Sequence, residues 1–197
     1  MYTVRIKAGR AEASATVEVL PDPRTTITQR DRQAKMELMK KVSQRLEVAA
    51  EAVDRIVAFR KVISTVLTQA HDRSDDKVKS LRAEAEKVRK KLSNVADQFI
   101  EEPNRVQGIT RNPRTVSVKL GSVLGSLRSS WDAPTSTQLT NLRQAESILE
   151  SALKDFNKVF AEDVLAFQKT VESAELKLFP DQKPLDLDWK PEKKEKE

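Results

Sequence analysis

The 197-residue chain has no cysteine, only four glycines, and few aromatic residues, which make up 5% of the total. Without cysteine, disulfides, thiol catalysis and cysteine metal sites are excluded. So little glycine nearly excludes phosphate-binding loops and tight active-site turns. No run approaches the roughly 20 apolar residues that a membrane-spanning helix needs, and we expect no signal peptide. These absences leave the architecture better defined than the chemistry.

Charged residues are abundant, at 34% of the chain, and the net charge is +6. Basic and acidic residues are interspersed along the predicted helices, as in 82–91, which favours a solvated surface with intrahelical pairs. Nucleic-acid-binding proteins more often gather their basic residues on one face with aromatic residues nearby. We therefore expect no nucleic-acid partner and no membrane span.

The first twenty residues have the period-two pattern of a β-hairpin. Apolar and polar residues alternate over 2–7 and again over 13–19, and Gly9 lies in the turn between these two runs. The prolines in 21–24 then interrupt the strand pattern, because proline cannot donate to a sheet ladder. A lone hairpin is only marginally stable in water. We therefore expect residues 1–24 to be the last two strands of a β-domain, with the other strands supplied by an upstream domain of a parent chain or by another chain.

Four amphipathic helices are predicted after the hairpin, each with apolar residues three or four positions apart. They span about 28–71, 75–102, 116–131 and 135–178. The second helix has the most regular apolar stripe, which comprises Val78, Leu81, Ala85, Val88, Leu92, Val95 and Phe99. Ser74 is expected to cap this helix, and Thr135 and Gln138 match the capping box that begins the fourth. Residues 103–115 are predicted to be a polar loop.

The predicted fold is mainly α: an antiparallel up-down four-helix bundle over residues 25–180, preceded by the β-hairpin. An even number of helices would return the C-terminus to the end where the hairpin lies. The first and fourth helices are longer than the other two, so we expect the long pair to project beyond the short pair or to bend. Residues 181–197 are expected to form a largely disordered tail. Within it Leu185, Leu187 and Trp189 alternate with charged residues and are candidates to pack back onto the bundle.

Residue types that carry catalysis or bind metals are scarce and scattered. His71 is the single histidine, and we interpret it as a partner of the dipole at the end of the first helix. Adjacent carboxylates occur at Asp75–Asp76, Glu101–Glu102 and Glu162–Asp163. Neighbouring helix positions point in different directions, so we interpret the first two pairs as helix-end charges and the third as a solvated face. With no E-x-x-H, P-loop, HExxH or GxSxG motif, we predict no catalytic, cofactor-binding or metal-binding residue, no cofactor and no enzymatic activity of this chain.

Two further features of the third helix are interpreted as structural. Trp131 lies in phase with the apolar residues of that helix and is predicted to be in the core. Gly121 and Gly125 lie four positions apart, which we interpret as a close approach of two helices and not as a ligand site. Trp189, in the proline-flanked tail, has no assignment from the sequence.

Two segments resemble part of a known family. One is Tyr-Thr-Val-Arg-Ile at 2–6, followed by a second strand and Leu-Pro-Asp-Pro-Arg at 20–24. The other is Trp-Asp-Ala-Pro-Thr-Ser-Thr-Gln-Leu at 131–139, with spaced leucines and phenylalanines after it. Together they resemble the C-terminal region of large bacterial BNR-repeat proteins, in which the end of an Ig-like domain leads into a helical bundle. Those proteins are commonly labelled glycosyl-hydrolase-like or sortilin-like and carry β-propellers upstream.

The resemblance implies that 1–24 belongs to an incomplete Ig-like domain and that the parent protein is extracytoplasmic, either secreted or envelope-associated. The Asp-box of the propeller, S-x-D-x-G-x-T-W, is absent here, so no catalytic residue is carried over. The predicted function is a non-catalytic structural or interaction module at the C-terminus of such a protein, with the upstream domains as partners. Two alternatives stay open. One is a self-standing helical protein that forms homo-oligomers through strand edges or helix ends, and the other is a bundle that buttresses a glycosidase-like propeller.

Overall fold

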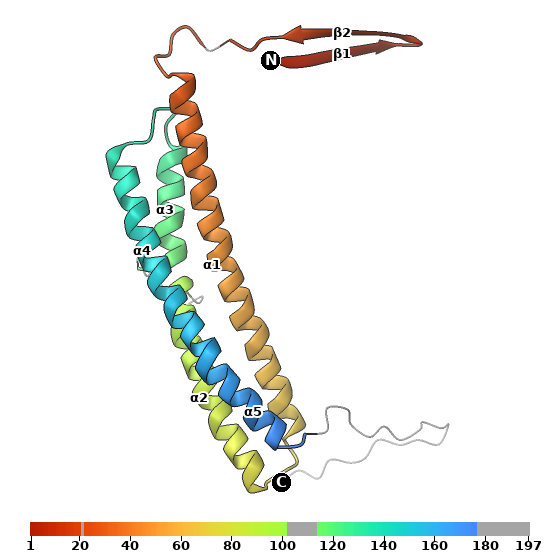
Figure 1. Cartoon of the computed structure of the whole chain (residues 1–197), viewed down its shortest axis with the longest axis vertical. Helices are drawn as coiled ribbons and strands as arrows, with labels where there is room; N and C mark the ends of the chain where they lie inside the picture. The colour runs from red at the N-terminus through yellow and green to blue at the C-terminus, as the bar shows by residue number, and fades with distance from the viewer. Residues whose placement is uncertain (21, 102–113, 177–197) are drawn as a thin grey trace, which may run out of the picture.

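The structure, a computed structural model, describes residues 1–20, 22–101 and 114–176. It is mainly helical and begins with an antiparallel hairpin of β1 (Tyr2–Ala8) and β2 (Ala11–Val17). The helices are α1 (Gln29–Gln69), α2 (Asp76–Phe99), α3 (Val116–Arg128), α4 (Ser136–Val159), a π-helical turn η1 (Phe160–Val164) and α5 (Leu165–Ser173). Because α4, η1 and α5 are continuous, they correspond to the single fourth helix of the prediction. The hairpin and the four helices are confirmed (Figure 1).

The hairpin has the register that its alternating pattern predicts. Tyr2 lies opposite Val17 and Ala8 lies opposite Ala11, so all the apolar residues of both strands share one face. Gly9 is the first of the two turn residues and has φ +62°. A positive φ at this position is what a type II′ hairpin turn requires, and glycine adopts it without a steric cost.

The helix starts are set by capping side chains. The hydroxyl of Thr135 accepts a hydrogen bond from the backbone N–H of Gln138, and the Gln138 side chain accepts one from the backbone N–H of Thr135, which confirms the expected capping box. The prediction that Ser74 caps the second helix is wrong. Asp75 takes this position, because its carboxylate accepts from the backbone N–H of Val78 at 3.3 Å.

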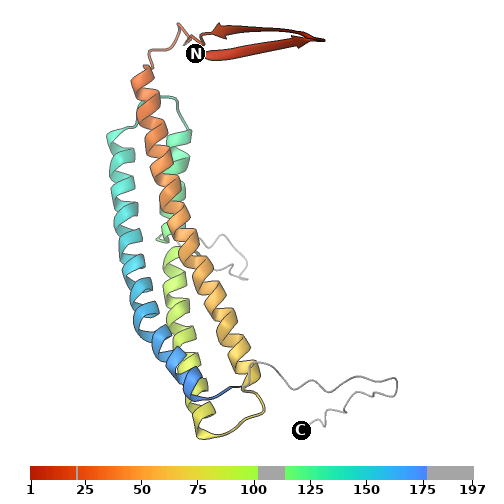
Figure 2. The ribbon, with the colours of Figure 1, turned by 45° about the vertical axis from the view of Figure 1, so that its right-hand side comes forward.

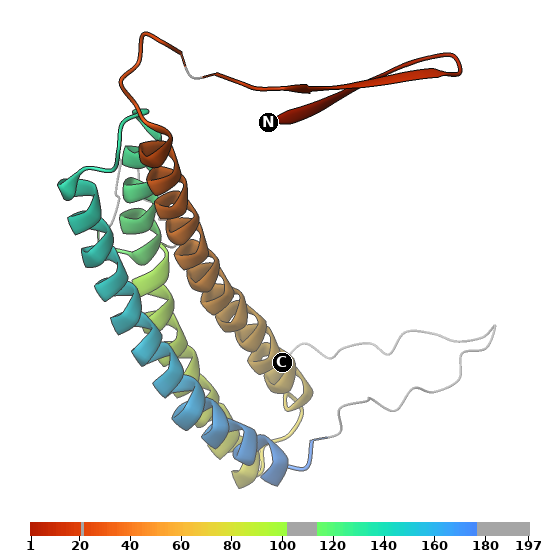
Figure 3. The same cartoon turned by 45° about the horizontal axis from the view of Figure 1, so that its top comes forward.

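The helices lie side by side as three rods, where four were predicted. One rod is α1, the second is α2 followed by α3, and the third is the continuous α4, η1 and α5. Hydrogen bonds pair Arg60 of α1 with Ser93 of α2, and Arg89 of α2 with Ser64 of α1, so these helices are antiparallel. At the other end of α1, the Lys35 side chain bonds the residues that follow α3. Both α2 and α3 therefore run back towards the start of α1, one after the other, as all three views show (Figures 1, 2 and 3).

This arrangement corrects the predicted up-down alternation. The second and third helices run in the same direction, and the fourth helix lies parallel to the first. As a result the C-terminal end of α5 lies beside the α1–α2 turn, where Arg73 donates to the carbonyl of Ala174 at 2.8 Å. The last described residues are thus at the opposite end of the rods from the hairpin. The physical reason is length: α2 and α3, with 24 and 13 residues, together nearly match the 41 residues of α1.

A continuous apolar core runs between the three rods. The predicted stripe of α2 is confirmed, since each of its seven residues is at most 4% exposed. The spaced leucines and phenylalanines of the fourth helix are mostly in this core: Leu142, Leu149, Phe156 and Phe167 are buried. Leu139, in the first turn of α4, is 43% exposed.

Aromatic rings fill the core where α4 gives way to η1. Phe59 packs edge-on against Phe160 and Phe167, with ring centroids 5.9 and 6.1 Å apart. Phe156 lies 4.4 Å from Phe160 and meets Phe99 edge-on at 6.4 Å. Five of the six phenylalanines of the chain belong to this cluster, which ties α1, α2 and the α4–α5 rod together at one level.

Candidate interaction surfaces

The single histidine has no catalytic surroundings. His71 follows the end of α1, as predicted, and its side chain is 85% exposed. Its Nδ1 lies 3.0 Å from a carboxylate oxygen of Asp72, which is itself fully solvated. The ring therefore interacts with a neighbouring exposed carboxylate, and no described nucleophile or second acid is positioned with it.

The carboxylate pairs do not converge on a common point. Asp75 caps α2 and accepts a hydrogen bond from Arg73 at 3.0 Å, and this bond lowers the pKa of the Asp75 carboxyl. Its neighbour Asp76 is exposed and pairs with Lys79 at 3.0 Å. Both residues act at the start of one helix, as predicted. The second pair cannot be described, because Glu102 lies outside the described residues.

The third pair differs from its prediction. Asp163 is only 13% exposed and accepts a hydrogen bond from Lys91 of α2 at 2.6 Å, so the predicted solvated face is wrong for this residue. The hydrogen bond to Asp163 raises the pKa of the Lys91 ammonium. Asp163 belongs to the π-helical turn, which places its side chain over α2, whereas Glu162 stays exposed. The ion pair between Lys91 and Asp163 therefore ties two rods together.

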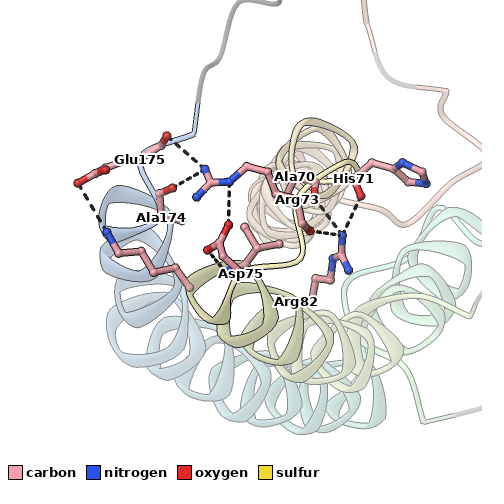
Figure 4. A network of polar contacts seen from close by, with 9 residues as sticks. Ala70, His71, Arg73, Asp75, Arg82, Ala174 and Glu175 are labelled. Atoms are coloured by element: carbon pink, nitrogen blue, oxygen red, sulfur yellow. Dashed lines mark hydrogen bonds and ion pairs between the residues drawn. The ribbon is translucent and has the colours of Figure 1, made fainter.

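A polar network closes the end of the rods at the α1–α2 turn (Figure 4). Arg82 of α2 donates to three backbone carbonyls, of Ala70, His71 and Arg73, at 3.0 to 3.1 Å. Arg73 in turn bonds Asp75 and the carbonyls at the end of α5. These arginines satisfy carbonyls that helix ends leave without partners. Neither arginine was predicted from the sequence, because the carbonyls that they bind belong to helix ends brought together by the fold.

Two predictions for the third helix are wrong: the burial of Trp131 and the close helix approach at Gly121 and Gly125. Trp131 is 83% exposed, because α3 ends at Arg128 and the helical phase that predicted its burial does not extend to it. Gly121 and Gly125 are exposed, and a Cβ at either position would meet no neighbouring atom within 4 Å. They therefore mark no close helix approach.

The described part of the chain holds neither a metal site nor a membrane-spanning helix. No group of three or more histidine or acidic side chains is gathered there closely enough to hold a metal ion. No helix within the same residues combines the length and the apolar character needed to cross a bilayer.

The hairpin presents one uncovered apolar face. Every residue of both strands is exposed, and the large apolar side chains Tyr2, Val4, Ile6 and Val17 are 45 to 66% exposed. The opposite face is polar, and on it Glu12 pairs with Arg5 at 2.9 Å and with Lys7 at 3.4 Å. In all three views the hairpin lies beyond the start of α1 and apart from the helices (Figures 1, 2 and 3).

A second apolar surface lies along the start of α1. It is a groove of about 1000 Å³, hereafter the α1 groove. Its apolar lining comprises Leu20, Ile27, Met36, Met39 and Trp131. Trp131, Leu20 and Met36 are 83%, 72% and 55% exposed, so much of this lining is uncovered. The groove and the hairpin face are two uncovered apolar surfaces available for partner binding.

Comparisons with known proteins identify no relative. No protein-family model matches the chain, and neither a curated protein nor a solved structure matches it.

Proposed function

We propose that this chain is a non-catalytic interaction module whose hairpin completes a β-sheet of a larger partner. The observation that carries the proposal is the bare apolar face of the hairpin. In a folded β-protein such a face is covered by a second sheet or by helices, because exposing it forgoes the burial that stabilises the sheet.

The size of the hairpin favours a large partner over a second hairpin. Each strand has seven residues, so the hairpin is about 23 Å long and about 10 Å wide. One face therefore offers roughly 230 Å², well below the approximately 800 Å² per partner of a stable interface. Two hairpins packed face to face would bury too little, whereas insertion into a larger sheet adds backbone hydrogen bonds along a strand edge.

The helical part suits a structural role. Several of its polar side chains close helix ends or join rods, and its core is mainly apolar, with Lys35 and Thr115 as the buried polar residues among those described. The resemblance to BNR-repeat proteins makes the proposal more specific. On this basis the hairpin would complete an Ig-like domain, in an extracytoplasmic parent protein whose propeller lies upstream. A buttress for a glycosidase-like propeller would be one use of the same attachment.

Hydrogen exchange tests the attachment. We expect the amides of residues 2–17 to exchange rapidly in the isolated chain, because a two-stranded hairpin opens easily. In the parent protein, expressed with the sequence that precedes residue 1 in its reading frame, we expect them to be protected by about a hundredfold or more.

Two variants test which face of the hairpin contacts the partner. Val4→Asp places a charge on the apolar face and should remove the protection, whereas Thr3→Asp places it on the polar face and should leave the protection intact. Rapid exchange of these amides in the parent protein, or equal effects of the two substitutions, would reject the proposed sheet completion.

A further inference from the structure

The α1 groove is flanked by two cations, Arg32 and Lys40, that have no partner among the described residues. Arg32, Met36 and Lys40 follow one another at intervals of four, so they lie on one face of α1. The Arg32 and Lys40 side chains are exposed, and neither forms an ion pair or a hydrogen bond with any described residue. Of the two acids on the groove, Asp22 is held by Arg24 at 2.7 Å, and Glu47 lies at the far end.

A peptide segment that binds this groove should have apolar residues that alternate with acidic residues. Apolar side chains would fill the floor between Met36, Met39 and Trp131, and acids would pair with Arg32 and Lys40. One segment of the chain outside the described residues has this chemistry. It is Leu-Asp-Leu-Asp-Trp at 185–189, and Lys190 follows it.

The two leucines of this segment cannot reach Met36 in the groove of their own copy. Ala174 lies beside the α1–α2 turn, and from Gln69 back to Met36 the helix rises about 50 Å. Leu185 is nine residues beyond Leu176, and nine fully extended residues span about 30 Å. The leucines therefore cannot fill the groove of their own copy.

The order of charges also favours a second copy. From Arg32 through Lys40 to Glu47 the groove changes from basic to acidic in the direction of α1. The segment changes from acidic, at Asp186 and Asp188, to basic at Lys190, so it matches when it runs in the same direction as α1. A tail of the same copy would approach along α1 in the reverse direction. A tail from an antiparallel neighbour would approach from the start of α1 and would run with it.

We propose that the α1 groove of one copy binds residues 185–189 of a second copy in an antiparallel dimer. A two-fold axis makes the exchange reciprocal, so each dimer contains two such contacts. Leu185 and Leu187 lie on the apolar floor, Trp189 packs near Trp131, and the two aspartates pair with Arg32 and Lys40. The hairpin takes no part in this contact.

Sedimentation equilibrium of the full chain over a range of concentrations tests the dimer. We expect a monomer–dimer equilibrium for the unmodified chain. The groove variant R32E/K40E and the tail variant D186K/D188K should each weaken dimerisation by about tenfold or more, because like charges then face one another. The variant that carries all four substitutions should dimerise about as strongly as the unmodified chain, because the charges are complementary again.

A control variant makes the same change in net charge as R32E/K40E, at positions outside the α1 groove. Lys90 and Lys154 are exposed on α2 and α4, away from the α1 groove, and K90E/K154E should leave the dimer unchanged. Circular dichroism confirms that every variant keeps its helix content. A monomer at all concentrations, a dimer that tolerates both reversals, or a four-substitution variant that does not recover would each overturn the proposal. Val4→Asp should not affect this dimer, which separates the outcome from that of the sheet completion.

Discussion

Lys35 on α1 donates a hydrogen bond from its ammonium group to the backbone carbonyl of Ser130, which lies 95 residues further along the chain. The same group reaches the carbonyl of Asp132 at 3.1 Å. Lys35 is only 7% exposed, so its charge is held beneath the connection between α3 and α4. This one side chain fixes the start of α1 against the end of the middle rod, and it is also one of the residues that line the α1 groove.

Replacement of Lys35 by methionine should destabilise the protein. Methionine keeps the apolar stem of the side chain without the ammonium group, so it leaves the carbonyls of Ser130 and Asp132 without a donor in a partly buried site. We expect the free energy of unfolding to fall by about 1–3 kcal/mol. Urea unfolding followed by circular dichroism measures it, with Lys61→Met at an exposed position of the same helix as the control. Equal stability of the two variants would show that the Lys35 contacts are not stabilising.

Glu146 makes stability depend on pH. Its carboxylate is 17% exposed and lies 3.0 Å from Lys41 and 2.9 Å from Arg45. Partial burial raises the pKa of Glu146, but the hydrogen bonds from Lys41 and Arg45 outweigh it, and the pKa lies below the ordinary glutamate value of 4.5. A carboxyl whose pKa is lowered by folding contributes stability above its unfolded pKa and loses it as the pH falls through the folded value.

Glu146→Gln should therefore cost stability near neutral pH and much less in acid. Both cationic partners are about 40% exposed, so we expect a loss of only about 1 kcal/mol at pH 7. The difference from the unmodified protein should shrink as the pH is lowered from 5 towards 3. Urea unfolding at a series of pH values checks this, and Glu150→Gln, at an exposed position of the same helix, should show no such trend. A pH-independent difference would contradict the assignment.

Gly121→Ala and Gly125→Ala should each stabilise the protein. Both glycines lie within α3, and an added Cβ meets no atom within 4 Å. Alanine restricts the unfolded chain and suits a helix better, so each substitution should raise the free energy of unfolding by about 0.5–1 kcal/mol. Thermal unfolding measures the gain, and Ser122→Ala on the same helix should give a smaller one. A loss of stability at either position would contradict the finding that an added Cβ has room there, and would favour the close helix approach that the spacing predicted.

Local patterns determined the elements of this protein. Period-two alternation and Gly9 specified the hairpin, and spacings of three and four specified the helices and nearly all of the α2 core residues. The capping box at Thr135 marked the start of α4 to the residue. These features depend on contacts between residues close in the sequence, so the sequence alone carries them.

Only the tertiary structure decided how the helices run and which apolar residues stay uncovered. No local pattern states whether a helix after a long connection reverses direction or continues, so the alternation of α2 and α3 was predicted wrongly. Trp131 shows the same limit, since its burial depended on where α3 ends and on what lies beside it. Lys35 gave no sequence signal, because its partners are carbonyls brought to it from 95 residues away. The two candidate surfaces exist for this physical reason: burial depends on long-range packing, and the rods of this chain leave the hairpin face and the α1 groove open.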